Sequence, residues 1–309
     1  MAYYAQIISA EIATILLNQT SAAGLATLED FRLVCDTLDL ETAQERAHIQ
    51  AFKTVGEAVE ASLFGDRLFT YPMRSMYEET MLFHAASRIR TFWRRIQMGG
   101  FSLLSSGNAF IGCQYFTVRG LRTLNGKMIQ HGLAQLYLGC ADREQAPVPA
   151  KISYCHFMDE SYHFNSSSII SRDVLRSLRP PTRFERWVAN QAIRGCQRDH
   201  FHFSVAVKGI FWYDPALFPT IYRLLRSPVF GMDDRDAKEM IRRCFTEESE
   251  GLHESSRLHR TAVESYRAYL DPLDYVSLEN RTMGLMHRST LEGYLAATRR
   301  AFAAFARAG

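Results

Sequence analysis

Several features that define common protein classes are missing from this chain. No run of about 18 apolar residues occurs, so we expect no membrane span. The N-terminus has no basic region, and Glu11 interrupts the apolar stretch that follows, so we expect no signal peptide. The six cysteines form no Cys-x-x-Cys pair and no regular spacing. This scatter argues against a disulfide framework and indicates reduced, mostly buried thiols of a cytoplasmic protein.

A large charge of one sign and a low-complexity linker are also missing. The net charge is only +3 and the sequence pI is about 8.5, which is too mild a basicity to argue for nucleic acid or an anionic membrane as a partner. With 47% hydrophobic residues the chain can bury a large core. We therefore expect a single domain over residues 1–309.

Alternating strand patterns are scarce, and helical periodicity dominates. We expect an apolar helix over 4–18 that breaks at Asn18–Ser21. Further helices are expected over 76–97, 150–170, 182–211, 234–268 and 287–307. Pro180 and Pro181 should provide the stop after the helix over 150–170, because the residue before a proline disfavours the helical conformation. The sequence predicts an all-α fold.

The strongest chemical pattern in the chain is Glu-x-x-His. It occurs at Glu160 and His163 and again at Glu250 and His253. Residues three apart on a helix share a face, so each copy directs a carboxylate and an imidazole the same way. His156 precedes Glu160 by four positions and adds a second imidazole to that face. We interpret all five residues as metal ligands.

A third copy of the pattern, at Glu45 and His48, serves as a control. It lies in a charged stretch that also contains Glu41 and Arg46. Such a stretch is typical of a solvated helix face, and we interpret it that way. Chance alone yields some matches to so short a motif.

Two facing helices with Glu-x-x-His are the arrangement of a ferritin-like bundle, in which two further helices each give a single Glu. We therefore predict such a bundle, with a metal-binding four-helix core over residues 75–265 and additional helices at both ends. Carboxylate and imidazole donors suit iron or manganese. We expect two Fe per chain, with Mn as the alternative.

The segment from Phe157 to His163 is similar to the Asp-Glu-x-x-His signature of the AurF-like p-aminobenzoate N-oxygenases. That resemblance implies a non-haem diiron enzyme that uses O2 to oxidise an amine of a small molecule or a carrier-bound amino acid. It also implies an external electron donor. Asp159 is a candidate partner for a ligating imidazole.

The ligand set departs from that family in two places. Family members have a His four residues before the second Glu, where this chain has Thr246. In addition, residues 80–141 contain no Asp or Glu, and the helix expected over 182–211 offers no clear match, so the lone carboxylates of the two remaining helices have no obvious source. The candidates for their replacement are Gln114, Glu79, His200 and His202.

Other functions stay open at this stage. The same metal site is compatible with C-hydroxylation or oxidative cleavage, because the substrate pocket decides the reaction. A helical binding protein with a degenerate metal site is the alternative outside the enzymes. The sequence also leaves open whether the chain forms a homodimer.

Overall fold

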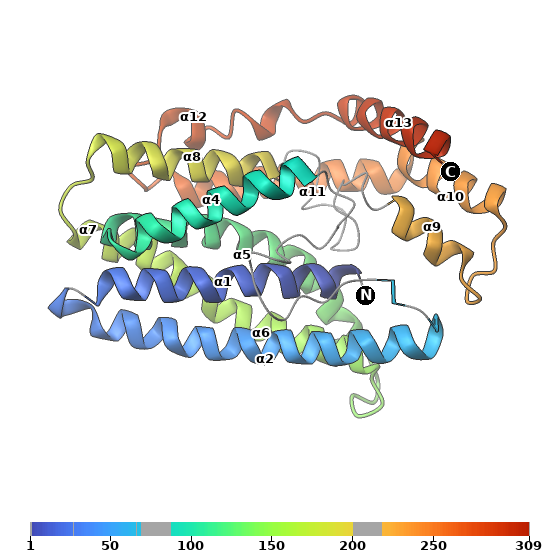
Figure 1. Cartoon of the computed structure of the whole chain (residues 1–309), viewed down its shortest axis with the longest axis horizontal. Coiled ribbons are helices and arrows are strands. Elements are labelled where there is room, and N and C mark those ends of the chain that lie inside the picture. Colours follow the sequence, from blue (N-terminus) through green and yellow to red (C-terminus); the bar gives the residue numbers. More distant parts are fainter. Residues whose placement is uncertain (1, 27, 66, 69–87, 200–217, 309) are drawn as a thin grey trace.

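The structure, a computed structural model, describes residues 2–26, 28–65, 67–68, 88–199 and 218–308. All regular elements in these ranges are helical, which confirms the predicted all-α fold (Figure 1). None of the described helices has the length and apolar character needed to cross a bilayer.

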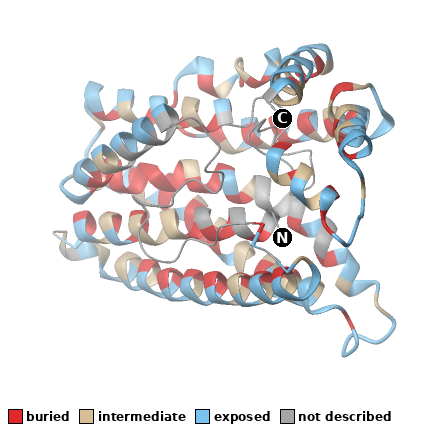
Figure 2. Cartoon of the chain, turned by 45° about the vertical axis from the view of Figure 1, so that its right-hand side comes forward, coloured by how far each residue is buried: buried red, intermediate tan, exposed pale blue. Residues whose placement is uncertain are grey.

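Four long helices form the bundle at the centre of the fold. They are α1 (Ala2–Leu25), α2 (Arg32–Leu63), α5 (Ala109–Leu138) and α6 (Val148–Ile169). Helix α1 packs along α2, α5 packs along α6, and the two pairs join through α1 with α5 and α2 with α6. Buried residues concentrate on the sides of these helices that face one another (Figure 2). This bundle starts well before residue 75, where the sequence placed the start of the metal-binding core.

The remaining helices contact the bundle mainly through α1 and α5. They are α4 (Arg88–Ser106), α7 (Leu175–Ser177), α8 (Arg183–Asp199), α9 (Phe218–Arg226), α10 (Asp234–Thr246), α11 (Glu250–Leu270), α12 (Leu278–Arg281) and α13 (Leu291–Ala308), with short 3-10 turns at Glu29–Phe31 and Met286–Arg288. The π-helical segment η2 (Ile170–Val174) joins α6 to α7. Helices α9, α10 and α13 pack together at the C-terminal end (Figure 1).

The predicted break at Asn18–Ser21 is wrong, because α1 continues to Leu25. Both residues are fully buried. The Ser21 hydroxyl donates to the carbonyl oxygen of Gly112 at 3.1 Å, and the Asn18 side chain contacts charged groups of α2 and α5. These polar side chains serve contacts between helices, so their turn propensity does not decide the local structure.

The helix predicted over 234–268 is two helices. Helix α10 ends at Thr246, and α11 starts at Glu250 with Ser249 as its N-cap, whose hydroxyl accepts from the Leu252 N–H. Serine at this position satisfies one of the free N–H groups at a helix start. Glu250 therefore lies in a first helical turn rather than in the middle of a long helix.

The cysteines are all free thiols, as predicted, but only Cys113 and Cys196 are buried. Cys155 and Cys244 are exposed.

Candidate metal centre

The first Glu-x-x-His motif lies on the inward face of α6. His156 and His163 have side chains that are 3% and 0% exposed, and that of Glu160 is 14% exposed. The Nε2 atom of His156 lies 3.2 Å from Glu160 Oε1, and the Nδ1 atom of His163 lies 3.5 Å from the same oxygen. The predicted triplet is therefore brought together inside the bundle.

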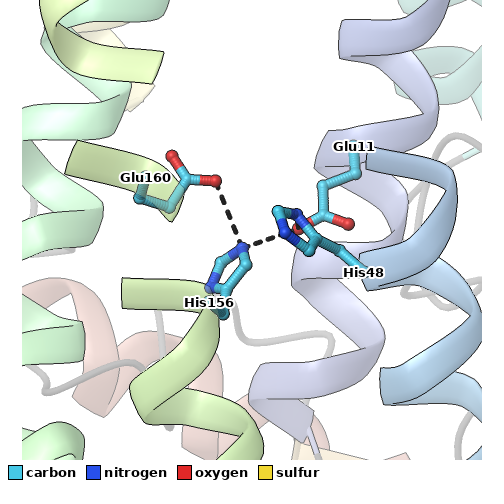
Figure 3. Close-up of side chains that lie close together, drawn as sticks. All are labelled: Glu11, His48, His156 and Glu160. Atoms are coloured by element: carbon cyan, nitrogen blue, oxygen red, sulfur yellow. Dashed lines mark hydrogen bonds and ion pairs between the residues drawn. The ribbon is translucent and has the colours of Figure 1, made fainter. Parts of the chain in front are cut away.

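Helices α1 and α2 bring the partners of this triplet (Figure 3). Glu11 of α1 places Oε1 2.8 Å from His156 Nε2. His48 of α2 places Nδ1 3.7 Å from the same Glu11 oxygen. Ligand atoms of Glu11, His48, His156 and Glu160 all lie within 4.8 Å of one another. We name these four residues group 1.

A second set of donors adjoins group 1. Glu45, Glu160 and His163 also place one ligand atom each within 4.8 Å of one another, and His163 Nδ1 lies 3.4 Å from Glu45 Oε1. We name these three residues group 2. Glu160 belongs to both groups, so the two groups adjoin at one carboxylate.

The interpretation of Glu45 and His48 as a solvated face is wrong. They are 2% and 8% exposed, and both face the bundle interior. The Glu-x-x-His copy that faces the α6 motif is thus the one at Glu45 and His48 on α2. A signal was available, because Glu41, Glu45, His48 and Phe52 recur at helical spacing and all four are buried.

The structure does not bring Glu250 and His253 to these groups. Both residues are exposed on the first turn of α11. The His253 Nε2 atom instead lies 2.7 Å from the exposed carboxylate of Glu248. Since α11 begins at Glu250, its first carboxylate sits beside solvent and the positive helix end, a favourable position that needs no metal.

Helix α1 places one lone carboxylate, Glu11, among the donors, and sequence reasoning missed it. A single acid inside an otherwise apolar helical stretch was the signal. Of the predicted replacements, Gln114 is fully buried on α5 and its amide has no hydrogen-bond partner among the described residues. Glu79, His200 and His202 lie outside the described residues.

Helix α5 contributes a cation to the centre instead of an acid. The Arg119 guanidinium is 5% exposed, pairs closely with Glu41 and lies 3.3 Å from Glu45 Oε1. It also donates to Asn18 Oδ1 at 3.2 Å, and the Ser166 hydroxyl donates to Glu41. Arg119 thereby fixes one oxygen of Glu45, while the other oxygen lies 3.4 Å from His48 Nδ1.

The protonation of the metal-free centre follows from its crowded carboxylates. Burial lowers the pKa of His48, but its contacts with Glu45 and Glu11 outweigh burial and raise the pKa to about 9. Burial likewise opposes protonation of His156, yet Glu11 and Glu160 raise its pKa to about 10. The pKa of Glu11 itself rises to about 7, chiefly through burial.

The shared carboxylate shows the opposite shift. Burial alone would raise the pKa of Glu160, but its close contacts with His156 and His163 hold it well below its usual range. In the metal-free protein, protons on the imidazoles therefore balance the carboxylates, and bound cations would displace those protons.

The donor atoms fit metal ions. His48 and His163 each use Nε2 in a hydrogen bond, at 2.9 Å to Asp159 and 3.1 Å to Gln44. The Nδ1 atoms of both rings are buried and have no hydrogen-bond partner. The same is true of the Oε2 atoms of Glu11 and Glu45. Ligating histidines usually donate their other ring N–H in this way, which fixes the tautomer. Glutamate and imidazole donors are those that iron and manganese accept.

Comparison with known proteins identifies a family for this chain. A family model described as CylC-like acyl halogenase matches residues 1–306. No curated protein and no solved structure matches the chain at a significant level. Because the matched region covers nearly the whole chain, this protein belongs to the CylC-like acyl halogenase family, an enzyme family related to the AurF-type diiron proteins.

Proposed function

We propose that this enzyme uses two metal ions and O2 to replace a C–H bond of an acyl substrate by a carbon–halogen bond. The observation that carries the proposal is the pair of donor groups joined through Glu160. The family membership supports the reaction type, since the family is described as acyl halogenases. When bound, a pair of iron or manganese ions supplies the redox chemistry that activates O2.

The charge of the centre favours an anion as a further ligand. Glu11, Glu41, Glu45 and Glu160 against Arg119 leave a net charge of −3 among the buried groups. When the imidazoles are neutral as metal ligands, two divalent ions would change this net charge to +1. A buried positive charge is costly unless it is paired, so binding of one monovalent anion is favourable.

The coordination also leaves room for such an anion. Group 1 offers four protein donors, whereas group 2 offers three, two carboxylates and one imidazole. Non-haem iron oxygenases typically use three protein donors, two imidazoles and one carboxylate, and leave positions open; group 2 has the same number of donors with one imidazole replaced by a carboxylate. Since α5 brings Arg119 rather than another acid, no further carboxylate from that helix fills the open positions.

The protein's own groups orient the donors and hold protons. Arg119 and Gln44 fix the orientation of Glu45 and His163, as described above. Asp159 holds the His48 ring, and its side chain is 44% exposed. Asp159 therefore connects the buried His48 imidazole to solvent. It offers a route by which protons can leave or enter the centre.

The overall reaction balances with a halide and an external donor. One C–H bond and one halide ion are consumed, O2 is reduced to two molecules of water, and two electrons and three protons are supplied. The two electrons come from a reductant, in agreement with the expected external electron donor.

N-oxygenation of an amine, the reaction implied by the Asp-Glu-x-x-His likeness, is the second candidate. It uses the same donors and O2 but needs no halide. Dependence of the product on a halide separates the two reactions.

The test is a product assay with the iron-loaded enzyme. A fatty acyl pantetheine thioester is incubated with O2, a chemical reductant, and chloride or bromide, and mass spectrometry detects the product. We expect a halogenated acyl product whose isotope pattern follows the halide supplied. Oxidation of an amine substrate at equal rates with and without halide would instead establish N-oxygenation.

A matched pair of variants assigns the reaction to the bundle. Glu160→Gln should abolish product formation, whereas Glu250→Gln, at the exposed motif, should leave it unchanged. An active Glu160→Gln enzyme would contradict the proposal.

A further inference from the structure

A basic pocket lies outside the metal centre, where the helix that carries Glu160 and His163 continues through η2 into α7. The cavity measures about 160 Å³ and is lined by four arginines, Arg172, Arg176, Arg179 and Arg186. Such a volume holds several water molecules and therefore a phosphate-sized group. Guanidinium groups bind phosphate oxygens through paired N–H donors.

Two of the guanidinium groups are held in place by neighbouring groups. Arg176 Nη2 donates to the carbonyl oxygen of Pro272 at 3.3 Å, and Arg179 Nη2 donates to Glu185 Oε1 at 2.9 Å. Glu185 is only 2% exposed and also accepts from Asn108 and from the Thr182 N–H. These contacts reduce the entropy lost when an anion binds, because the side chains are already ordered.

The surrounding backbone adds positive potential. Arg183 and Arg186 lie in the first turn of α8, where the helix dipole disfavours cations and favours anions. Thr182 and Glu185 cap this helix reciprocally, with Thr182 Oγ1 accepting from the Glu185 N–H at 3.2 Å. Cations at a helix N-terminus break a local electrostatic rule, and such departures are expected at functional sites.

Acidic groups offset part of this charge without cancelling it. Arg172 forms a two-point pair with Asp173, at 2.9 and 3.0 Å. Glu185 pairs with Arg179, and Asp274 lines the cavity. Four arginines against three acids leave one net positive charge, before the helix end is counted.

We propose that this pocket binds the phosphate of the pantetheine arm that carries the acyl substrate. The inference rests on the proposed function, since it assumes an acyl thioester. Arg176 and Arg186 are the residues expected to contact the phosphate, because neither pairs with an acid in a described ion pair.

The distance to the metal centre suits this ligand. Glu160 and Arg172 are twelve residues apart on one continuous helix, which corresponds to about 18 Å along its axis. The arm between phosphorus and sulfur has about 13 bonds, so its extended length is roughly 15 Å by standard chain dimensions. With its phosphate in the pocket, an extended arm would cover most of this axial distance, and the acyl chain that it carries would cover the rest.

The experiment compares two fluorescent probes by anisotropy with the full-length protein. One probe is 4′-phosphopantetheine labelled at its thiol, and the other is the same molecule without the phosphate. We expect the phosphorylated probe to bind at least tenfold more tightly. We also expect Arg176→Gln/Arg186→Gln to remove this preference, and Arg235→Gln, an exposed arginine on α10, to retain it.

Equal binding of the two probes by the unmodified protein would overturn the assignment, whatever the variants do. A folded double variant that keeps the preference would overturn it as well, and the single variant Arg186→Gln serves the same purpose if the double variant fails to fold. Because neither O2 nor halide is used, failure of halogenation and failure of phosphate binding are separate results.

Competition then identifies the source of the phosphate. Unlabelled coenzyme A and a phosphopantetheinylated carrier protein are each titrated against the bound phosphorylated probe. Stronger displacement by either one supports the pocket and names its natural ligand. Displacement by neither contradicts it.

Discussion

The stability of the metal-free protein should fall as the pH rises above neutrality, because its carboxylate cluster relies on protonated imidazoles. The folded-state pKa of His48 is raised from 6.5 to about 9. A raised histidine pKa stabilises the fold fully below the unfolded pKa. That contribution is then lost as the pH rises through the folded pKa. His156, with a pKa of about 10, acts in the same direction.

The magnitude follows from the same shift. For His48 alone, the free energy of unfolding should decrease by about 2 kcal/mol between pH 6.5 and 8.5, since each retained proton contributes about 1.4 kcal/mol per pH unit. Urea unfolding of the metal-free protein at several pH values in this window measures the loss.

Two controls make the prediction specific to the centre. With Mn²⁺ bound the decrease should be much smaller, because the cations replace the protons. His48→Gln should reduce the pH dependence, with the contribution of His156 remaining, whereas His253→Gln, at an exposed position, should preserve it. A metal-free protein whose stability stays constant or rises from pH 6.5 to 8.5 would refute the reasoning.

Two further changes test the packing around the centre. Arg119→Met should destabilise the metal-free protein by about 3–5 kcal/mol in urea unfolding, because Glu41 would lose its buried partner. Adding Glu41→Gln should restore part of the lost stability, and no recovery would argue against the Arg119–Glu41 ion pair. Gly24→Ala should cost about 1–3 kcal/mol, because the new Cβ would lie 2.6 Å from the Ser105 carbonyl oxygen. Gly100→Ala, which meets no atom within 4 Å, should raise the thermal midpoint slightly, and equal midpoints for the two glycine variants would contradict this packing.

The sequence was sufficient for the fold class and for half of the centre. The α6 motif was predictable because His156, Glu160 and His163 share one helical face within eight residues. The stop at Pro180 and Pro181 is also present, since α7 ends at Ser177 and α8 begins at Arg183.

The other half depended on contacts distant in sequence. His48 meets His156 across 108 positions, and no local pattern specifies that pairing. The inward face of α2 carries charged ligands where an ordinary bundle helix carries apolar residues, so its polarity indicated a solvated face. Conversely, Glu250 and His253 matched the motif but fell at a helix start that the N-cap Ser249 determines.

The most direct test of the two-metal centre is to count and locate the ions. Crystals of the protein soaked with Mn²⁺ should show two anomalous peaks per chain, about 3.5–4 Å apart. One peak is expected at group 1 and the other at group 2, with Glu160 next to both. Elemental analysis should find two ions in the unmodified protein and in Glu250→Gln, but at most one in Glu160→Gln. Ions located at Glu250 and His253, or two ions retained in Glu160→Gln, would contradict the centre described here.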